Sequence, residues 1–148
     1  MFRGSASATV DDKGRLKIPT DFRRVLEERW GGGGEVFITS VHGDAAFVYP
    51  LAVWEERETK LLALPSTDRS RDRYLERVNY FGQQVKVDPQ GRALIPQLLR
   101  ERAGMSGEVV VQGRLDHLVV WNHERFATKL ESDPITDDDF QRLADKGI

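Results

Sequence analysis

The feature that most constrains this chain is an internal repeat. Residues 10–19 and residues 87–96 both fit the pattern V-D-x-x-G-R-x-x-I-P, so that each residue of the second copy is numbered 77 higher than its equivalent. Later apolar runs correspond at smaller offsets of 73 and 72, which places a short insertion in the first copy near residues 31–34. Two copies of one supersecondary unit are expected to pack around a pseudo-two-fold axis and to share a core. Whatever both copies present is therefore the first candidate for function.

Length and composition describe a soluble globular protein. The chain has 148 residues, of which 39% are hydrophobic and 31% charged, enough for one ordinary core or for two small halves that share one. No apolar run approaches the roughly 18 residues of a membrane-spanning helix, and the N-terminus lacks the layout of a secretion signal. The chain has no cysteine, so disulfides and thiolate metal sites are excluded. We therefore expect a cytoplasmic protein that does not contact membranes.

Charge is distributed unevenly along the chain. Residues 1–130 hold 20 lysines and arginines against 18 acidic residues, whereas residues 131–148 hold 2 against 6. The net charge of −2 therefore reflects an acidic tail that follows the second copy. A nearly neutral body still binds polyanions if its positive charges gather on one face, so the net charge does not decide whether the chain binds nucleic acid.

Each copy is predicted to fold as strand, turn, strand, short helix and further strands. Pro19 and Pro96 are expected at the first position of the short helices. Helical composition also marks residues 51–64, a segment after residue 68, and the stretches 124–131 and 137–144. The predicted class is α+β, with small sheets from two related halves and peripheral helices. We expect half 1 at residues 5–52, a connecting helical segment at 53–80, half 2 at 81–124, and a C-terminal helix with an acidic tail at 125–148.

The turn between the first two strands of each copy carries the repeated chemistry. The turn-shaping residues are an aspartate and a glycine in each copy, namely Asp11, Gly14, Asp88 and Gly91. The aspartates are placed to accept hydrogen bonds from amides inside the turn, and the glycines are expected to take a positive φ. The arginines that follow, Arg15 and Arg92, have two interpretations. In the first, they pair with the aspartates and only stabilise the hairpin. In the second, the two guanidinium groups are exposed together and bind phosphates or the edges of guanine bases.

Basic residues are denser in the first copy. Lys13 and Lys17 are expected to contact phosphates, and Arg3 is expected to join them; Gln90 and Leu94 replace the two lysines in the second copy. One such unit offers only a handful of positive contacts, so its non-specific binding should be weak at physiological salt. Useful affinity would then require several units on one DNA, with avidity supplying the difference.

These motifs resemble a known family. The start M-F-R-G, the paired D-x-x-x-R signature at residues 11–15 and 88–92, and the arginine-bearing helix between the copies are similar to the MraZ family of bacterial transcriptional regulators, over nearly the whole chain. The resemblance implies a swapped-hairpin, β-barrel-like core built from two SpoVT/AbrB-like halves. It also implies ring-shaped homo-oligomers that bind tandem, short G-rich boxes in the promoter of a division and cell-wall gene cluster. Carried over by position, Arg15 and Arg92 would be the principal DNA contacts.

Other kinds of chemistry are not indicated. The three histidines, His42, His117 and His123, show no metal-ligand spacing, and the glycines at 31–34 lack the ending of a phosphate loop. No nucleophile elbow and no cysteine nucleophile are present. We therefore expect no enzyme activity, metal, cofactor or small-molecule ligand. The arginines at residues 69–77 alternate with acids, which favours a solvated or subunit-contacting helix over a DNA-facing one.

The sequence thus predicts an oligomeric regulator that binds double-stranded DNA on the nucleoid and represses the cluster containing its own gene. Two other hypotheses remain. In the first, the chain is an AbrB-like antitoxin whose tail beyond residue 132 blocks a toxin, although such antitoxins usually carry one copy. In the second, it is a structural assembly protein whose arginines only staple turns.

Overall fold

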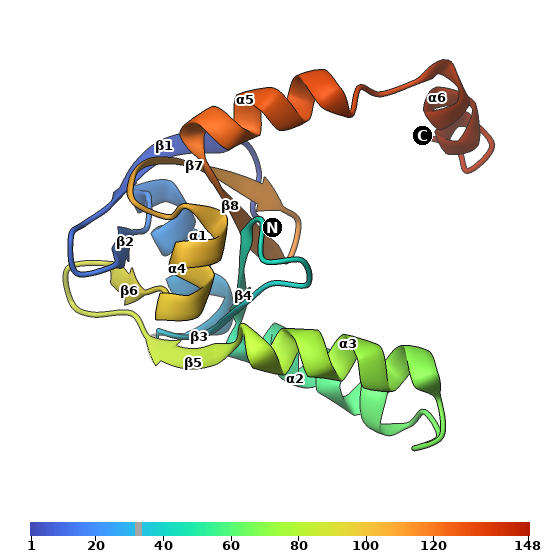
Figure 1. The fold of residues 1–148 in the computed structure, drawn as a ribbon, viewed down its shortest axis with the longest axis horizontal. Helices are drawn as coiled ribbons and strands as arrows, with labels where there is room; N and C mark the ends of the chain where they lie inside the picture. The colour runs from blue at the N-terminus through green and yellow to red at the C-terminus, as the bar shows by residue number, and fades with distance from the viewer. Residues whose placement is uncertain (32–33) are drawn as a thin grey trace.

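The computed structural model describes residues 1–31 and 34–148 (Figure 1). Its strands are β1 (Ser5–Val10), β2 (Arg15–Lys17), β3 (Glu35–Thr39), β4 (Ala46–Pro50), β5 (Gln83–Lys86), β6 (Arg92–Leu94), β7 (Gly107–Arg114) and β8 (His117–Asn122). Its helices are α1 (Thr20–Trp30), α2 (Leu51–Leu62), α3 (Arg69–Tyr80), α4 (Gln97–Ala103), α5 (His123–Ser132) and α6 (Asp137–Ala144). Residues 32 and 33, inside the glycine run that was expected to form a loop, lie outside the described residues.

The described strands form one eight-stranded sheet in the order β5-β3-β4-β8-β7-β1-β2-β6. The first strand of each half pairs with the third strand of the other half, because β1 runs antiparallel to β7 and β5 runs antiparallel to β3. The outer strands β5 and β6 are joined by a tight turn, in which the Asp88 amide donates to the Arg92 carbonyl over 2.9 Å. The sheet therefore curls into a nearly closed barrel with exchanged hairpins. The expected α+β class with a barrel-like core is confirmed.

The strand register shows where the pseudo-two-fold axis lies. In the β2–β6 ladder Leu16 pairs with Ala93, its own equivalent in the second copy. In the β4–β8 ladder Phe47 pairs with Val119, again its own equivalent. A residue pairs with its equivalent only where a two-fold axis crosses the ladder. The axis therefore passes through both ladders and relates the two halves, as the repeat predicts.

One hydrophobic core serves both halves. Leu16 and Ile18 from the first half and Ile95 and Leu99 from the second are fully buried in the same cluster. Burial of one such side chain contributes about 1.5 to 3 kcal/mol to folding. Because the cluster draws equally on both copies, each half relies on the other to complete its core.

The short helices begin one residue later than expected. Pro19 has φ −54° and ψ 141°, and Pro96 has φ −53° and ψ 136°. These ψ values are extended, so each proline is the N-cap and the helices begin at Thr20 and Gln97. The prediction of a first helical position is wrong by one residue, because the fixed φ of proline fits both places and its missing amide is not needed at either.

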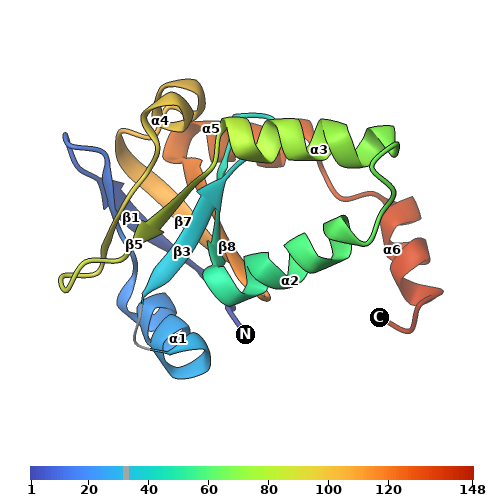
Figure 2. The same ribbon diagram turned by 90° about the horizontal axis from the view of Figure 1, so that it is seen from below.

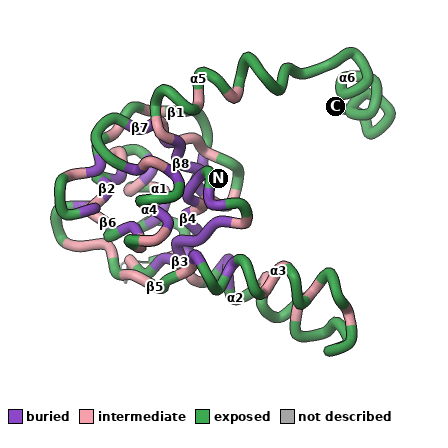
Figure 3. Tube along the Cα trace, viewed as in Figure 1, coloured by how far each residue is buried: buried purple, intermediate pink, exposed green. Residues whose placement is uncertain are grey.

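Two helical arms leave the barrel. The arm formed by α2 and α3 follows β4, and the arm formed by α5 and α6 follows β8 (Figure 1, Figure 2). The first arm is packed at its base, where Phe37 stacks on Trp54 with ring centroids 4.5 Å apart and Val78 is buried. In the second arm every residue of α6 is exposed, and Figure 3 shows the contrast with the buried strands of the barrel. Among the described helices, none is both long and apolar enough to cross a membrane.

Candidate nucleic-acid interface

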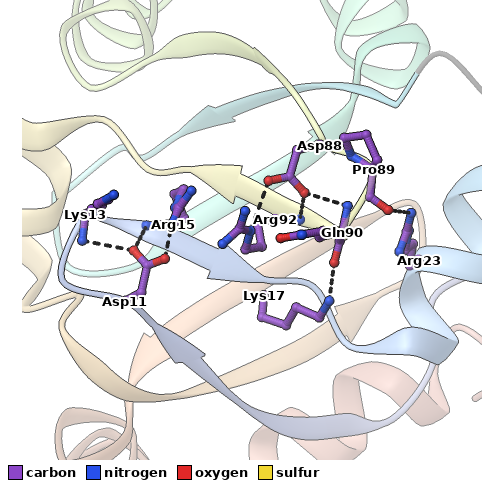
Figure 4. A network of polar contacts seen from close by, with 9 residues as sticks. All are labelled: Asp11, Lys13, Arg15, Lys17, Arg23, Asp88, Pro89, Gln90 and Arg92. Atoms are coloured by element: carbon purple, nitrogen blue, oxygen red, sulfur yellow. Dashed lines mark hydrogen bonds and ion pairs between the residues drawn. The ribbon is translucent and has the colours of Figure 1, made fainter.

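Each turn is held by its leading aspartate. The Asp11 carboxylate accepts hydrogen bonds from the backbone amides of Lys13 and Arg15, at 3.0 and 2.9 Å. Asp88 accepts the equivalent pair of bonds in the second copy, both at 2.9 Å (Figure 4). The glycine that ends each turn has φ 84° in the first copy and 81° in the second, a conformation that glycine adopts without steric cost. The two turns therefore share one fixed geometry.

These hydrogen bonds lower the pKa of both aspartates. The backbone amide of Arg15 has the largest effect on Asp11, and that of Arg92 on Asp88; burial opposes it, and the arginine side chains add to the lowering. Because the folded pKa lies below the ordinary value of 3.8, the ionised carboxylates stabilise the fold above pH 3.8, and this contribution disappears as the pH falls through the folded pKa. We expect Asp11→Asn with Asp88→Asn to flatten the loss of thermal stability on acidification. Parallel losses in the variant and the wild type would contradict this.

Arg15 and Arg92 are each held by one nitrogen. The Nε of Arg15 donates to Asp11 over 2.9 Å, and the Nε of Arg92 donates to Asp88 over 3.0 Å. Within the described residues, neither guanidinium group makes another side-chain hydrogen bond. The Nη1 and Nη2 atoms of each arginine therefore keep four N–H donors for a ligand. The side chains are 31% and 27% exposed. The ion pair thus orients each guanidinium group and leaves its outer edge accessible. The arginines are therefore able both to stabilise the turns and to bind a ligand.

The β2–β6 ladder brings residues from both copies onto one outward surface. We call this surface the ladder face and define it by four residues, Arg15, Lys17, Arg92 and Leu94. Leu94 lies opposite Arg15, and Arg92 lies opposite Lys17. Residues paired across an antiparallel ladder point to the same side, as do alternate residues of one strand. The central residue of each strand is fully buried on the other side, so the ladder face points away from the core.

An arginine from the other half packs against each turn. The Arg100 guanidinium lies over Gly14, where an added Cβ would come within 2.2 Å of its carbon atom. Arg23 lies over Gly91, 3.0 Å from such a Cβ, and donates from Nη2 to the Pro89 carbonyl over 2.8 Å. Each turn is therefore supported by a helix of the opposite half. Arg23 and Arg100 were not among the predicted site residues, but they are separated by the same 77 positions as the motif, and that signal identifies them.

Gly14→Ala is expected to destabilise the fold. The new side chain must adopt φ near 84° and displace the Arg100 guanidinium, and the left-handed conformation alone costs an L residue about 1 to 2 kcal/mol. Gly4 offers a matched control, because its φ is also 84° and no heavy atom of the described chain lies within 4 Å of the added Cβ. We expect thermal melts to show a larger loss for Gly14→Ala than for Gly4→Ala. Equal losses would mean that Arg100 moves aside without cost.

The other predicted basic residues divide into two groups. Lys13 is exposed in the first turn, next to the ladder face. Lys17 reaches the second turn, where its Nζ donates to the Gln90 carbonyl (Figure 4). Arg3 precedes β1, and only the far end of that strand leads into the first turn. The structure therefore brings Lys13 and Lys17 to the ladder face and leaves Arg3 away from it.

Helix α3, which carries the arginines at residues 69–77, lies across the barrel from β2 and β6 (Figure 1). Arg71 donates from Nε to the Leu61 carbonyl over 3.0 Å, which ties α3 to α2. Arg77 pairs with its neighbour Glu76 at 3.3 Å. These contacts favour the solvated or subunit-contacting interpretation of this helix over the DNA-facing one.

The ladder face is a two-stranded β-ribbon that carries positive charge. The major groove of B-DNA, about 12 Å wide, admits such a ribbon. Arg15 and Arg92 are diagonal neighbours across the ladder, a separation of about 7 to 8 Å in a typical antiparallel pair, or roughly two steps of 3.4 Å along a DNA strand. The outer edge of each guanidinium group matches the O6 and N7 atoms of guanine, or a phosphate. The geometry is therefore suited to two arginine contacts on one short stretch of duplex.

Comparison with known proteins identifies the family. A family model described as "MraZ protein, putative antitoxin-like" matches residues 1–77 and 82–145. The chain is 47% identical to the transcriptional regulator MraZ of Acidobacterium capsulatum and 47% identical to that of Koribacter versatilis, with 100% of both chains covered in each case. It is 38% identical to the transcriptional regulator MraZ of Moorella thermoacetica, over 100% of this chain and 97% of the relative. The resemblance seen in the motifs is thereby confirmed, and the chain belongs to the MraZ family of transcriptional regulators.

Proposed function

We propose that this chain regulates transcription by sequence-specific binding of duplex DNA through the ladder face. The observation that carries the proposal is the register of β2 and β6, which makes Arg15 and Arg92 diagonal neighbours on one accessible ribbon. Both guanidinium groups are already oriented by aspartates, so little side-chain freedom is lost when DNA binds. In this proposal the arginines contact bases or phosphates, and Lys13 and Lys17 add phosphate contacts.

The proposed targets are short G-rich boxes repeated in tandem in a promoter. Guanine presents two acceptors to the major groove, and a bidentate arginine is the commonest specific contact to them. Binding to such boxes upstream of the division and cell-wall cluster would repress it, together with the regulator's own gene. The protein would then act on the nucleoid, in the cytoplasm. These targets rest on the family resemblance and on the two arginines.

A ring-shaped homo-oligomer is the proposed active form. The three cations of the ladder face and Lys13 beside it would release only about four counterions per subunit, so several subunits on tandem boxes are needed for tight binding. The exposed C-terminal arm supports self-association. Ile135, Phe140 and Leu143 are 61%, 56% and 37% exposed, although α6 is well formed and has a capping box at Thr136. An amphipathic helix of this kind is expected to be covered by another protein surface.

The number of boxes in the DNA tests the proposed function. Fluorescence anisotropy at fixed salt would measure binding to duplexes with one, two, three or four G-rich boxes. Avidity predicts an affinity gain of at least about tenfold per added box until the oligomer is occupied, and a loss when the spacing is changed by half a helical turn. Equal binding to boxes and to a scrambled duplex would overturn the proposal.

Removal of the apolar side chains of α6 is expected to reduce the oligomer. Phe140→Ser with Leu143→Ser leaves the barrel intact, because every residue of α6 is exposed in the chain itself. Light scattering should then report a lower mass than for the wild type. Arg142→Ser on the same helix is the matched control and should keep the wild-type mass. Arg142 is 75% exposed, and its one ion pair within the described residues is with Asp138 on the same helix. An unchanged mass in the double variant would place the subunit contact elsewhere.

An antitoxin function is the alternative. The description of the matching family model includes that role. The acidic tail at residues 131–148 is also exposed throughout, as a segment that covers a toxin would be before it binds. A small toxin encoded beside the gene would favour this function if the full chain relieved its growth arrest and a chain ending at residue 132 did not. Relief by both forms would argue against the arm as the neutralising segment.

A further inference from the structure

The two ends of the ladder face differ in chemistry although their backbones are symmetric. The pseudo-two-fold axis exchanges two identical arginines, but it also exchanges Lys17 with Leu94 and Lys13 with Gln90. Lys17 is exposed, and Leu94 is 43% exposed on the same surface. A duplex laid across the axis therefore meets a different set of groups at each end.

The register decides which side chains share an end. Leu94 lies directly opposite Arg15, and Lys17 lies directly opposite Arg92. Directly opposite residues have Cβ atoms about 4.5 to 5.5 Å apart, close enough to contact neighbouring base pairs. One end therefore offers an arginine beside an apolar side chain, and the other offers an arginine beside an ammonium group.

These neighbours select different groups on DNA. Leucine makes no hydrogen bonds, and the apolar group that the major groove presents is the 5-methyl of thymine. Lysine is a compact charge that suits a phosphate. The Lys17 ammonium also contacts the Gln90 carbonyl, so this side chain extends along the ribbon toward the second turn, where the DNA backbone would pass. Leu94 has a shorter side chain and lies directly opposite Arg15 in the ladder.

Resting on the proposed function, we propose that the ladder face binds duplex DNA in one fixed orientation. Leu94 contacts the methyl group of a thymine next to the base that Arg15 reads, and Lys17 holds a phosphate at the Arg92 end. A symmetric face would bind a box equally well in both directions and would suit an inverted repeat. A face with unequal ends distinguishes a box from its reverse, so Leu94 is a specificity residue and Lys17 helps to set the direction.

Directed cleavage tests the orientation. Because the chain has no cysteine, Asp12→Cys provides a single attachment point for an iron–EDTA reagent on the first turn. On a duplex with one box, this protein should cleave one flank only. Adding Gln90→Lys and Leu94→Lys makes the face symmetric, and cleavage should then appear on both flanks. Equal cleavage of both flanks by the Asp12→Cys protein alone would overturn the fixed orientation, whereas failure to bind any box would overturn the proposed function instead.

Substitution of thymine by uracil tests the role of Leu94, because it removes only the 5-methyl. At one position of the box we expect the wild type to lose about fourfold in affinity, the value for one buried methyl-sized carbon. Leu94→Lys should be insensitive to that change and should steepen the salt dependence by about one counterion. The matched variant Lys17→Leu should make the salt dependence shallower by about one counterion. Wild-type binding that is indifferent to uracil at every thymine of the box would remove Leu94 from the readout.

Discussion

Arg15→Ala combined with Arg92→Ala is expected to weaken specific DNA binding by a factor of about 10² to 10⁴. Each good bidentate contact to guanine contributes about 1 to 3 kcal/mol of discrimination, and the two arginines lie as diagonal neighbours on the ladder face. Folding should be little affected, because both side chains are partly exposed and ion pairs of this kind contribute at most about 1 kcal/mol. Anisotropy with a multi-box duplex would measure the loss, and circular dichroism would check the fold.

Two further variants separate charge from geometry. Arg15→Lys keeps the positive charge but not the planar donor fork, so it should weaken discrimination between a box and a scrambled duplex while the salt dependence stays close to that of the wild type. Arg142→Ala removes an arginine from α6, across the molecule from the ladder face (Figure 1), and should leave the affinity for a single box unchanged. If the affinity of the double alanine variant for the boxes were within a few-fold of the wild-type affinity, the two arginines would only stabilise the turns.

Leu16→Ala is expected to cause the largest loss of stability among the single substitutions considered. Leu16 is fully buried and lies on the pseudo-two-fold axis opposite Ala93, so the cavity would open where the two halves meet. Truncation of a buried leucine costs about 2 to 5 kcal/mol. Domains are stable by about 5 to 15 kcal/mol, and a large share would be lost. Urea denaturation would measure the change.

The same axis supplies a rescue experiment. Leu16 and Ala93 are equivalent positions, so Leu16→Ala with Ala93→Leu moves the larger side chain to the other strand and keeps the total volume. Ala93→Leu alone should overpack the core at a cost of about 1 to 3 kcal/mol, and the double variant should recover much of what either single variant loses. Simple addition of the two losses would show that the surroundings of these positions are not related by the axis.

The sequence predicts the symmetry of this fold better than its connectivity. A constant offset over ten residues is enough to infer two related halves, and the register of Leu16 with Ala93 confirms the axis. The exchange of β1 and β5 between the halves has no local signal, because a strand shows the same alternation whichever neighbour it pairs with. Only the family resemblance indicated exchanged hairpins. The mistake at Pro19 and Pro96 has the same kind of cause, since N-cap and first helical residue place equal demands on φ.

For the candidate site, too, the local features could be predicted from the sequence and the long-range contacts could not. The turn residues were readable from sequence because their hydrogen bonds join near neighbours, as between Asp11 and Arg15. The 77-residue offset marks Arg23 and Arg100 as equivalent residues, but it does not show that Arg100 supports Gly14, because that contact joins the two halves. The opposition of Leu94 to Arg15 likewise depends on a pairing register between distant segments. That these residues bind DNA stays a prediction for the experiments above.

Strand exchange between covalently joined halves also makes the pairing of the two arginines independent of protein concentration. In a dimer of separate single-copy chains, dilution would part the two arginines, because assembly depends on concentration. Here α2 and α3 tether the halves, so each half meets the other within one chain, whatever the total amount of protein. The two-arginine unit therefore persists in a cell that holds few copies. If the proposed function holds, only the association of whole chains on neighbouring boxes would depend on how much protein has been made.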